Sequence, residues 1–193
     1  MAMSITYFVH GTTTDNENHK ASGWSDVGLS ELGKKQSVAL REVVKKEKFH
    51  AVFCSDLGRA VETASIAFGS SSVVKDERLR ECNYGEMAGK SSGEVDPMML
   101  QRIEVPFPRG ESYKDVEARM RSFLEDVLLK YDGKHVAVVA HRAPQLALDV
   151  LLRGKTWETA IKEDWRLKNE WKPGWEYILN ELPDVYKKRR API

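Results

Sequence analysis

The sequence contains few of the residues that stabilise small disulfide-bonded or zinc-bound folds. It has two cysteines, Cys54 and Cys82, in 193 residues. Two cysteines are too few for a disulfide scaffold or for a zinc site built from four thiolates. Stability must therefore come from a hydrophobic core, and hydrophobic residues make up 41% of the chain, which is enough to form one.

Long apolar stretches and an excess charge of one sign are also missing. No stretch approaches the roughly 20 apolar residues that cross a bilayer, and no basic-then-apolar segment resembles a signal peptide. We therefore expect a cytoplasmic protein. The chain has 30 Lys and Arg against 29 Asp and Glu, a formal net charge of +1. This balance predicts neither a nucleic-acid partner nor a membrane partner.

The exception to this even distribution of charge is the basic run KKRR at residues 187–190. A frayed, solvated tail is the simpler interpretation of such a run. A patch that binds nucleic acid or another partner is the alternative.

Strand-like and helix-like segments alternate along the chain. β-Branched, aromatic and apolar residues predict strands at 4–9, 51–54, 73–74, 135–140 and 175–180. Helices are expected at 31–46, 59–68, 111–131 and 143–152. The run at 135–140 is the most apolar and predicts a central strand buried on both faces, whereas the last strand is expected at an edge. The alternation predicts an α/β fold, a three-layer sandwich whose mostly parallel sheet is covered by helices on both faces.

The first expected helix shows a start signal and a hydrophobic pattern. Ser30 is a candidate N-cap. The apolar residues expected on the buried face of this helix are Leu32, Val38, Leu40, Val43 and Val44.

A long irregular segment at residues 76–110 interrupts the alternation with Gly, Pro and Ser. Insertions of this length in a compact domain usually serve as functional lids. We therefore expect a single domain over residues 1–193 with a lid-like insertion at 76–110.

Histidines and arginines follow three of the expected strands. His10 follows the first, Arg59 lies just beyond the second, and His141 and Arg142 follow the central strand. Because parallel strands end at the same edge of a sheet, where ligands bind, these side chains should converge. Fixed arginine charges would repel a divalent metal ion but bind a phosphate dianion. We therefore expect a local anion site that needs no metal and no other cofactor.

Five segments carry motif-like patterns in a recognisable order. They are YFVHGTTTDN at 7–16, SDLGRAVETA at 55–64, LRECNYG at 79–85, GES at 110–112 and VVAH at 138–141. The first resembles the pattern Arg-His-Gly-x-Thr followed by Asn, and the second resembles Ser-x-Leu-x-Arg-Ala-x-x-Thr. The third resembles Leu-x-Glu-x-x-x-Gly, the fourth a Gly-Glu-Ser turn, and the fifth a second histidine motif. In this order they resemble the histidine phosphatase (phosphoglycerate mutase-like) superfamily.

The resemblance implies a metal-independent phosphomonoesterase that acts on a small phosphorylated metabolite. His10 would be the nucleophile that forms a phosphohistidine, Glu81 the general acid and base, and His141 the second catalytic histidine. The resemblance further implies that Gly11, Asn16 and Arg59 bind the phosphate.

Two positions depart from the family pattern. Val9 stands where the family has the arginine that grips the phosphate, and Arg142 follows His141 where the family usually has glycine. We expect Arg142 to reach the phosphate in place of the missing arginine. The loss at Val9 leaves a catalytically weak or inactive phosphate-binding protein as one alternative. Mutase-type phosphoryl transfer is another, although the resemblance implies that mutases place arginine directly after the acidic glutamate, where this chain has Cys82.

Overall fold

The computed structural model describes residues 2–70, 73–168 and 174–180. It contains a sheet with the strands β1 (Met3–Val9), β2 (Ala51–Cys54), β3 (Val73–Lys75), β4 (His135–Ala140) and β5 (Trp175–Leu179). Their order across the sheet is β3-β2-β4-β1-β5. All pairings are parallel except that of the edge strand β5, which runs antiparallel to β1. The expected central strand and edge strand are both confirmed.

The helices follow the alternation that the sequence predicts. The α-helices are α1 (Thr14–Glu17), α2 (Glu31–Val44), α3 (Gly58–Phe68), α4 (Ser92–Val95), α5 (Tyr113–Tyr131), α6 (Arg142–Arg153) and α7 (Trp157–Lys162). The 3₁₀ helices are η2 (Glu77–Leu79), η3 (Gly85–Met87), η4 (Asp96–Arg102) and η5 (Trp165–Lys168). The sequence analysis did not predict α1, α7 or η5.

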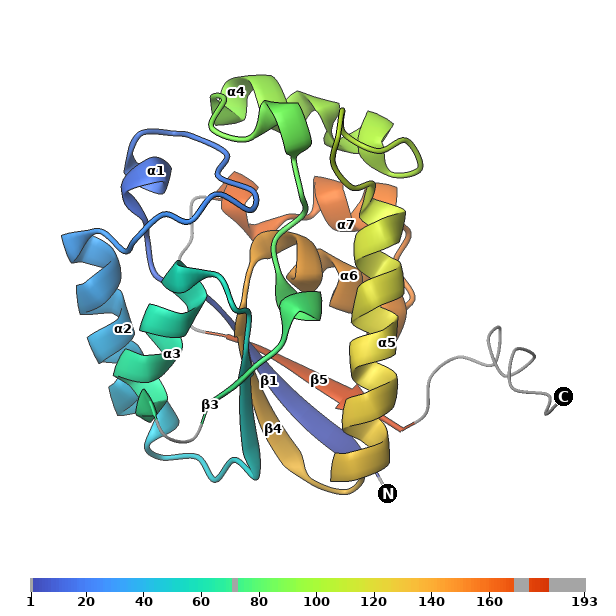
Figure 1. Cartoon of the computed structure of the whole chain (residues 1–193). Helices are drawn as coiled ribbons and strands as arrows, with labels where there is room; N and C mark the ends of the chain where they lie inside the picture. The colour runs from blue at the N-terminus through green and yellow to red at the C-terminus, as the bar shows by residue number, and fades with distance from the viewer. Residues whose placement is uncertain (1, 71–72, 169–173, 181–193) are drawn as a thin grey trace, which may run out of the picture.

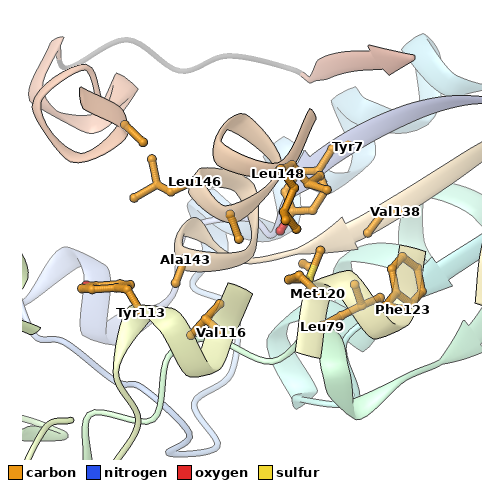
Figure 2. Packing of buried hydrophobic residues seen from close by; sticks show 14 of the residues in the cluster. Tyr7, Leu79, Tyr113, Val116, Met120, Phe123, Val138, Ala143, Leu146 and Leu148 are labelled. Atoms are coloured by element: carbon orange, nitrogen blue, oxygen red, sulfur yellow. The ribbon is translucent and has the colours of Figure 1, made fainter. Parts of the chain in front are cut away.

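Two hydrophobic cores cover the two faces of the sheet, because successive side chains of a strand point to opposite faces. In β4, Val136 and Val138 pack into the core that contains α5 and α6, whereas Ala137 and Val139 pack against α2 and α3. Figure 2 shows the first core, where Met120 and Phe123 of α5 lie near Val138. Figure 1 shows the resulting layers, with α2 and α3 on one side of the sheet and α5 on the other. The predicted three-layer α/β sandwich is confirmed.

Serine residues begin two of the long helices. Ser30 accepts the backbone N–H of Gly33 at 3.2 Å and caps α2, as predicted. Ser112 accepts the N–H of Asp115 at 3.1 Å, and the Asp115 carboxylate accepts the N–H of Ser112 at 2.8 Å. This reciprocal capping box starts α5 directly after the Gly-Glu-Ser turn.

The buried face of α2 differs from the expected one. Leu40 and Val44 are buried, but Leu32, Val38 and Val43 are 50%, 52% and 44% exposed. The helix packs through Gly33 instead, where a Cβ atom would lie 2.0 Å from the backbone oxygen of Thr12. The close approach of the loop after β1 therefore sets the rotation of α2, and this approach needs a residue without a side chain.

The insertion at residues 76–110 contributes to the main core. Leu79, Val95 and Met99 are buried in the cluster that also contains α5 and α6. Figure 1 places α4 at the top of the view, beyond one end of the sheet. The insertion is therefore anchored by apolar contacts, each worth about 1.5–3 kcal/mol for a large buried side chain.

Two further predictions concern partners. In the described ranges, no helix combines the length and the apolar character that crossing a membrane requires. The basic run at 187–190 lies outside the described residues.

Candidate active site

A cavity of about 300 Å³ opens beyond the carboxyl ends of β1 and β4. The residues predicted for the site that line it are His10, Asn16, Arg59, Glu81 and Arg142. The other two predicted residues, Gly11 and His141, do not line the cavity but are buried next to it. The edge of the sheet at which the motif residues were expected to converge therefore borders a cavity.

His10 stands at the end of β1 with its ring held in one orientation. Its Nδ1 atom lies 2.7 Å from the backbone oxygen of Gly11. A carbonyl oxygen can only accept, so Nδ1 carries the proton and Nε2 of the neutral ring keeps its lone pair. Desolvation and then the charge of Arg59 lower the pKa of His10 to about 3. At neutral pH His10 is therefore an uncharged base with its reactive nitrogen unprotonated.

Arg59 is the cation nearest this nitrogen. Its Nε donates to His10 Nε2 at 3.3 Å. Two backbone oxygens fix the other end of the guanidinium, because Nη1 donates to Ser25 at 2.9 Å and Nη2 donates to Gly23 at 2.7 Å. Arg59 is 2% exposed, so its charge acts in a poorly solvated environment where electrostatic interactions are strong.

A threonine joins the first two motifs. The N–H of Gly11 donates to Oγ1 of Thr63 at 3.0 Å, and that hydroxyl donates to the backbone oxygen of Arg59 at 2.8 Å. A Cβ atom on Gly11 would lie 2.5 Å from the backbone oxygen of Gly33. These contacts fix the loop after His10 against α2 and α3. The predicted contact of Gly11 with phosphate stays a prediction.

His141 lies beside His10 at the end of β4. The two rings are arranged edge to face with centroids 5.0 Å apart. The hydroxyl of Tyr7 donates to the backbone oxygen of His141 at 2.6 Å and accepts its N–H at 2.9 Å. His141 is fully buried, and neither of its ring nitrogens has a partner among the described residues. Buried polar atoms are nearly always hydrogen-bonded, so these two nitrogens are exceptions. The predicted catalytic role of His141 stays a prediction.

Glu81 reaches the cavity from the insertion and ends at the start of α6. Its Oε1 accepts the N–H groups of Cys82 at 2.8 Å and Ala143 at 3.0 Å, and its Oε2 accepts that of Arg142 at 3.2 Å. A helix N-terminus presents free N–H groups and attracts a negative charge. The carboxylate of Glu81 is thus held by the two residues that directly follow His141.

A brace from α5 holds the backbone of Glu81. Arg119 donates to the backbone oxygen of Glu81 at 2.9 Å and pairs with the carboxylate of Glu111 at 3.0 Å. Glu111 also accepts the N–H of Asn83 at 2.9 Å, and Trp24 donates to the same Glu81 oxygen at 2.6 Å. The Gly-Glu-Ser turn therefore acts through Arg119 on the position of Glu81. The sequence identified the turn but not this role.

Asn16 and Arg142 line the cavity, and each already has internal partners. Oδ1 of Asn16 accepts the N–H of Thr13 at 3.0 Å, which leaves its amide nitrogen for other contacts. The guanidinium of Arg142 pairs through Nε with Asp164 and through Nη1 with Asp96 at 2.7 Å. Burial opposes the charge of Arg142, but these carboxylates outweigh it and raise its pKa. The predicted phosphate contacts of both residues stay predictions.

The sequence analysis missed several polar residues of the cavity, among them Lys20, Tyr84, Asp96 and Arg166. They come from the loop after β1, the insertion and η5, and only Tyr84 lies in a motif-like segment, where it was given no role. Only the folded chain brings them together, because each depends on contacts between segments far apart in the sequence. Nor do the described residues contain a group of three or more His, Cys, Asp or Glu side chains that could hold a metal ion.

Comparison with known proteins points to one family. The model of the histidine phosphatase superfamily (branch 1) matches residues 7–173. A 2,3-bisphosphoglycerate-dependent phosphoglycerate mutase of Tropheryma whipplei is 31% identical over 165 residues, which cover 68% of this chain and 75% of the mutase. Phosphoglycerate mutase-like protein 4 of Arabidopsis thaliana is 33% identical over 145 residues, which cover 68% of this chain and 63% of that protein.

Solved structures show the same architecture. A mycobacterial glucosyl-3-phosphoglycerate phosphatase in complex with VO3 superposes with a TM-score of 0.72 at 28% identity. The alignment covers 82% of this chain and 86% of that one. The YhfR protein of Bacillus stearothermophilus has a TM-score of 0.73 at 27% identity, with 82% and 83% of the two chains covered.

Proposed function

The chain belongs to the histidine phosphatase superfamily, and from this premise we propose that it is a metal-independent phosphomonoesterase acting on a small phosphorylated metabolite. The observation that carries the proposal is the state of His10. Its Nδ1–H donates to Gly11, its pKa is lowered to about 3, and its Nε2 lies in the cavity beside Arg59. A neutral imidazole whose Nε2 carries no proton and lies among cations is suited to attack a phosphate dianion.

In the first step Nε2 of His10 attacks the phosphorus atom. The N–P bond forms as the P–O ester bond breaks, and the electron pair leaves on the ester oxygen, which takes a proton from Glu81. The alcohol departs and a phosphohistidine remains. In the second step a water molecule attacks phosphorus and gives its proton to Glu81. The N–P bond breaks, inorganic phosphate leaves, and His10 returns to its neutral form.

Positive charge and N–H donors around the phosphoryl group would stabilise its loose transition state. Arg59 is best placed for this, since its Nε already reaches the atom that attacks. Burial and the charge of Arg59 hold the pKa of His141 well below its usual range, so its ring is neutral and offers a single N–H donor. The amide nitrogen of Asn16 is a further donor. The charge of Arg142 is already balanced by Asp96 and Asp164, so we assign it a smaller share than Arg59.

The test is to trap the intermediate. Protein incubated briefly with a ³²P-labelled sugar phosphate and quenched in alkali should retain label that acid removes, as a phosphoramidate does. The variant His10→Asn should retain none and should hydrolyse no substrate, while His19→Asn, which changes an exposed histidine, should behave as the wild type. Label that survives in His10→Asn would refute the assignment of the nucleophile.

A mutase is the second candidate, because curated relatives carry that name. It would return the phosphoryl group to another hydroxyl of the substrate instead of to water. Cys82, which follows Glu81, is fully buried and brings no cation to the cavity, and this favours the phosphatase. Product analysis distinguishes the two, since a phosphatase releases inorganic phosphate from a phosphoglycerate and a mutase forms its isomer. Phosphate binding without either product would instead indicate the inactive binding protein.

A further inference from the structure

The start of β5 lies at the same end of the sheet as His10. β5 runs antiparallel to β1, and its first residue, Trp175, pairs with Tyr7. The chain therefore enters β5 from the carboxyl end of β1, where Val9 and His10 stand. The ring of Trp165 lies 5.6 Å from that of Trp175, and both Trp165 and Arg166 line the cavity. Arg166 thus lines the same cavity as Val9 and His10.

A buried carboxylate fixes the turn that carries Arg166. Asp164 is 1% exposed, and its Oδ1 accepts the backbone N–H of Arg166 at 3.0 Å. Its Oδ2 accepts Nε of Arg142. Because Arg142 directly follows His141, this ion pair ties η5 to the second histidine. The arginine at 142 and the aspartate at 164 therefore work together to hold Arg166 at the cavity.

The charge of Arg166 is not committed to another side chain in the described part of the protein. Four cations line the cavity, namely Lys20, Arg59, Arg142 and Arg166. Arg142 is paired with two carboxylates, whereas Arg166 is exposed and makes no ion pair with any described residue. Its charge also reaches the nucleophile, because it adds to desolvation and Arg59 in lowering the pKa of His10.

We propose that Arg166 binds the phosphoryl group that His10 attacks. Arg166 would supply the guanidinium that is missing at position 9, where the family has arginine and this chain has Val9. Arg142 is then a positioning residue that acts through Asp164. This inference rests on the proposed function, and it assigns to that site a phosphate-binding residue on η5 instead of on β1. A bidentate guanidinium is the donor best matched to two phosphate oxygens.

The test compares Arg166→Gln with Lys162→Gln. Both variants remove one exposed positive charge from neighbouring turns, but Lys162 does not line the cavity. The readouts are kcat/KM for 4-nitrophenyl phosphate, which has a single anionic group, and the inhibition constant for inorganic phosphate. Arg166→Gln should lower the first and raise the second by about 10- to 100-fold, the effect of losing a charge-assisted contact. Lys162→Gln should change neither by more than about 2-fold.

A rescue experiment tests the link to Val9. The change Val9→Arg should restore most of the activity lost in Arg166→Gln but add little to the wild type, because both guanidinium groups would serve the same phosphate. Equal effects of Val9→Arg in the two backgrounds would show that the two positions act independently and would overturn the inference.

The outcomes separate this inference from the proposed function. Wild-type protein that forms no phosphohistidine and releases no phosphate refutes the proposed function itself. Wild-type activity that Arg166→Gln and Lys162→Gln leave equally intact refutes only the role of Arg166. A loss in Arg166→Gln confined to 3-phosphoglycerate, with 4-nitrophenyl phosphate unaffected, also refutes it, because Arg166 would then bind a second anionic group.

Discussion

Arg119 of α5 donates to the backbone oxygen of Glu81 at 2.9 Å, and this contact links the longest helix to the carboxylate proposed as general acid. The same guanidinium forms a two-point pair with Glu111, at 3.0 Å and 3.2 Å. Glu81 lies in the insertion, in the stretch between η2 and η3 that belongs to no helix or strand. Its position therefore depends on this brace and on the N–H groups at the start of α6.

We predict that Arg119→Lys lowers kcat for an alkyl phosphate by about 10-fold and leaves phosphate inhibition unchanged. Lysine keeps the charge but cannot hold Glu111 and the Glu81 oxygen with one planar group. Arg119 does not line the cavity, so substrate binding should be spared. The control Arg153→Lys, which alters an ion pair with Asp149 on α6, should change neither quantity. An equal rise in the phosphate inhibition constant would show that the brace shapes the whole site.

The depressed pKa of His10 predicts a pH-dependent cost in stability. Between pH 6.5 and about 3 the unfolded chain binds a proton at His10 that the folded chain excludes. Stability at this site therefore falls as pH drops through that window, by about 2 kcal/mol at pH 5. Urea unfolding at pH 7.5 and 5.0 should show a loss for the wild type that is larger by this amount than the loss for His10→Asn.

His19→Asn is the control for this measurement, because it removes an exposed histidine and should keep the pH dependence of the wild type. Parallel curves for the wild type and His10→Asn would mean that the imidazole of His10 is protonated as easily in the folded state as in the unfolded chain.

Catalysis should persist without divalent metal. The cavity presents four cationic side chains and two carboxylates, and one of those carboxylates is paired with Arg142. Such a lining does not resemble the oxygen-rich sites that bind magnesium. Dialysis against EDTA should leave kcat/KM for 4-nitrophenyl phosphate unchanged. A rate that returned only on addition of Mg²⁺ or Zn²⁺ would contradict the proposed chemistry.

The sequence predicted the layers of the fold and the residues of the rim because both follow from local patterns. The apolar run of β4 and the histidines after β1 and β4 can be identified in the sequence without knowledge of any tertiary contact. The prediction of the buried face of α2 was wrong, because the close approach of Thr12 to Gly33 sets the rotation of the helix. The hydrophobic pattern of the helix does not reveal this contact.

The sequence analysis also missed the side of the cavity that η5 forms, again because it depends on tertiary contacts. Arg166 reaches the site because β5 pairs antiparallel with β1 and because Asp164 pairs with Arg142, 22 residues away in the sequence. Neither pairing has a local signature. The same holds for Arg119, which an ordinary amphipathic helix presents to a loop 38 residues away.

The role of Glu81 can be separated from that of the other site residues by the leaving group. The variant Glu81→Gln keeps one oxygen for the N–H groups of Cys82 and Ala143, and its amide nitrogen faces the N–H of Arg142. The fold should therefore tolerate it at a cost of about 1–3 kcal/mol for one unpaired N–H. Glu86→Gln is the matched control, because it neutralises an exposed carboxylate of the same insertion that pairs with Arg109.

An alkoxide leaving from a sugar phosphate needs a proton in the transition state, whereas 4-nitrophenolate is stable enough to leave without one. General acid catalysis is typically worth about 10²–10⁴-fold. Glu81→Gln should slow hydrolysis of alkyl phosphates by about that factor. With 4-nitrophenyl phosphate it should give a burst of nitrophenol, because phosphorylation of His10 is spared while the attack of water has lost its base. Stopped-flow measurement of the burst decides the matter: if Glu81→Gln slowed both steps equally for both substrates, or neither, the proton would have to come from another group.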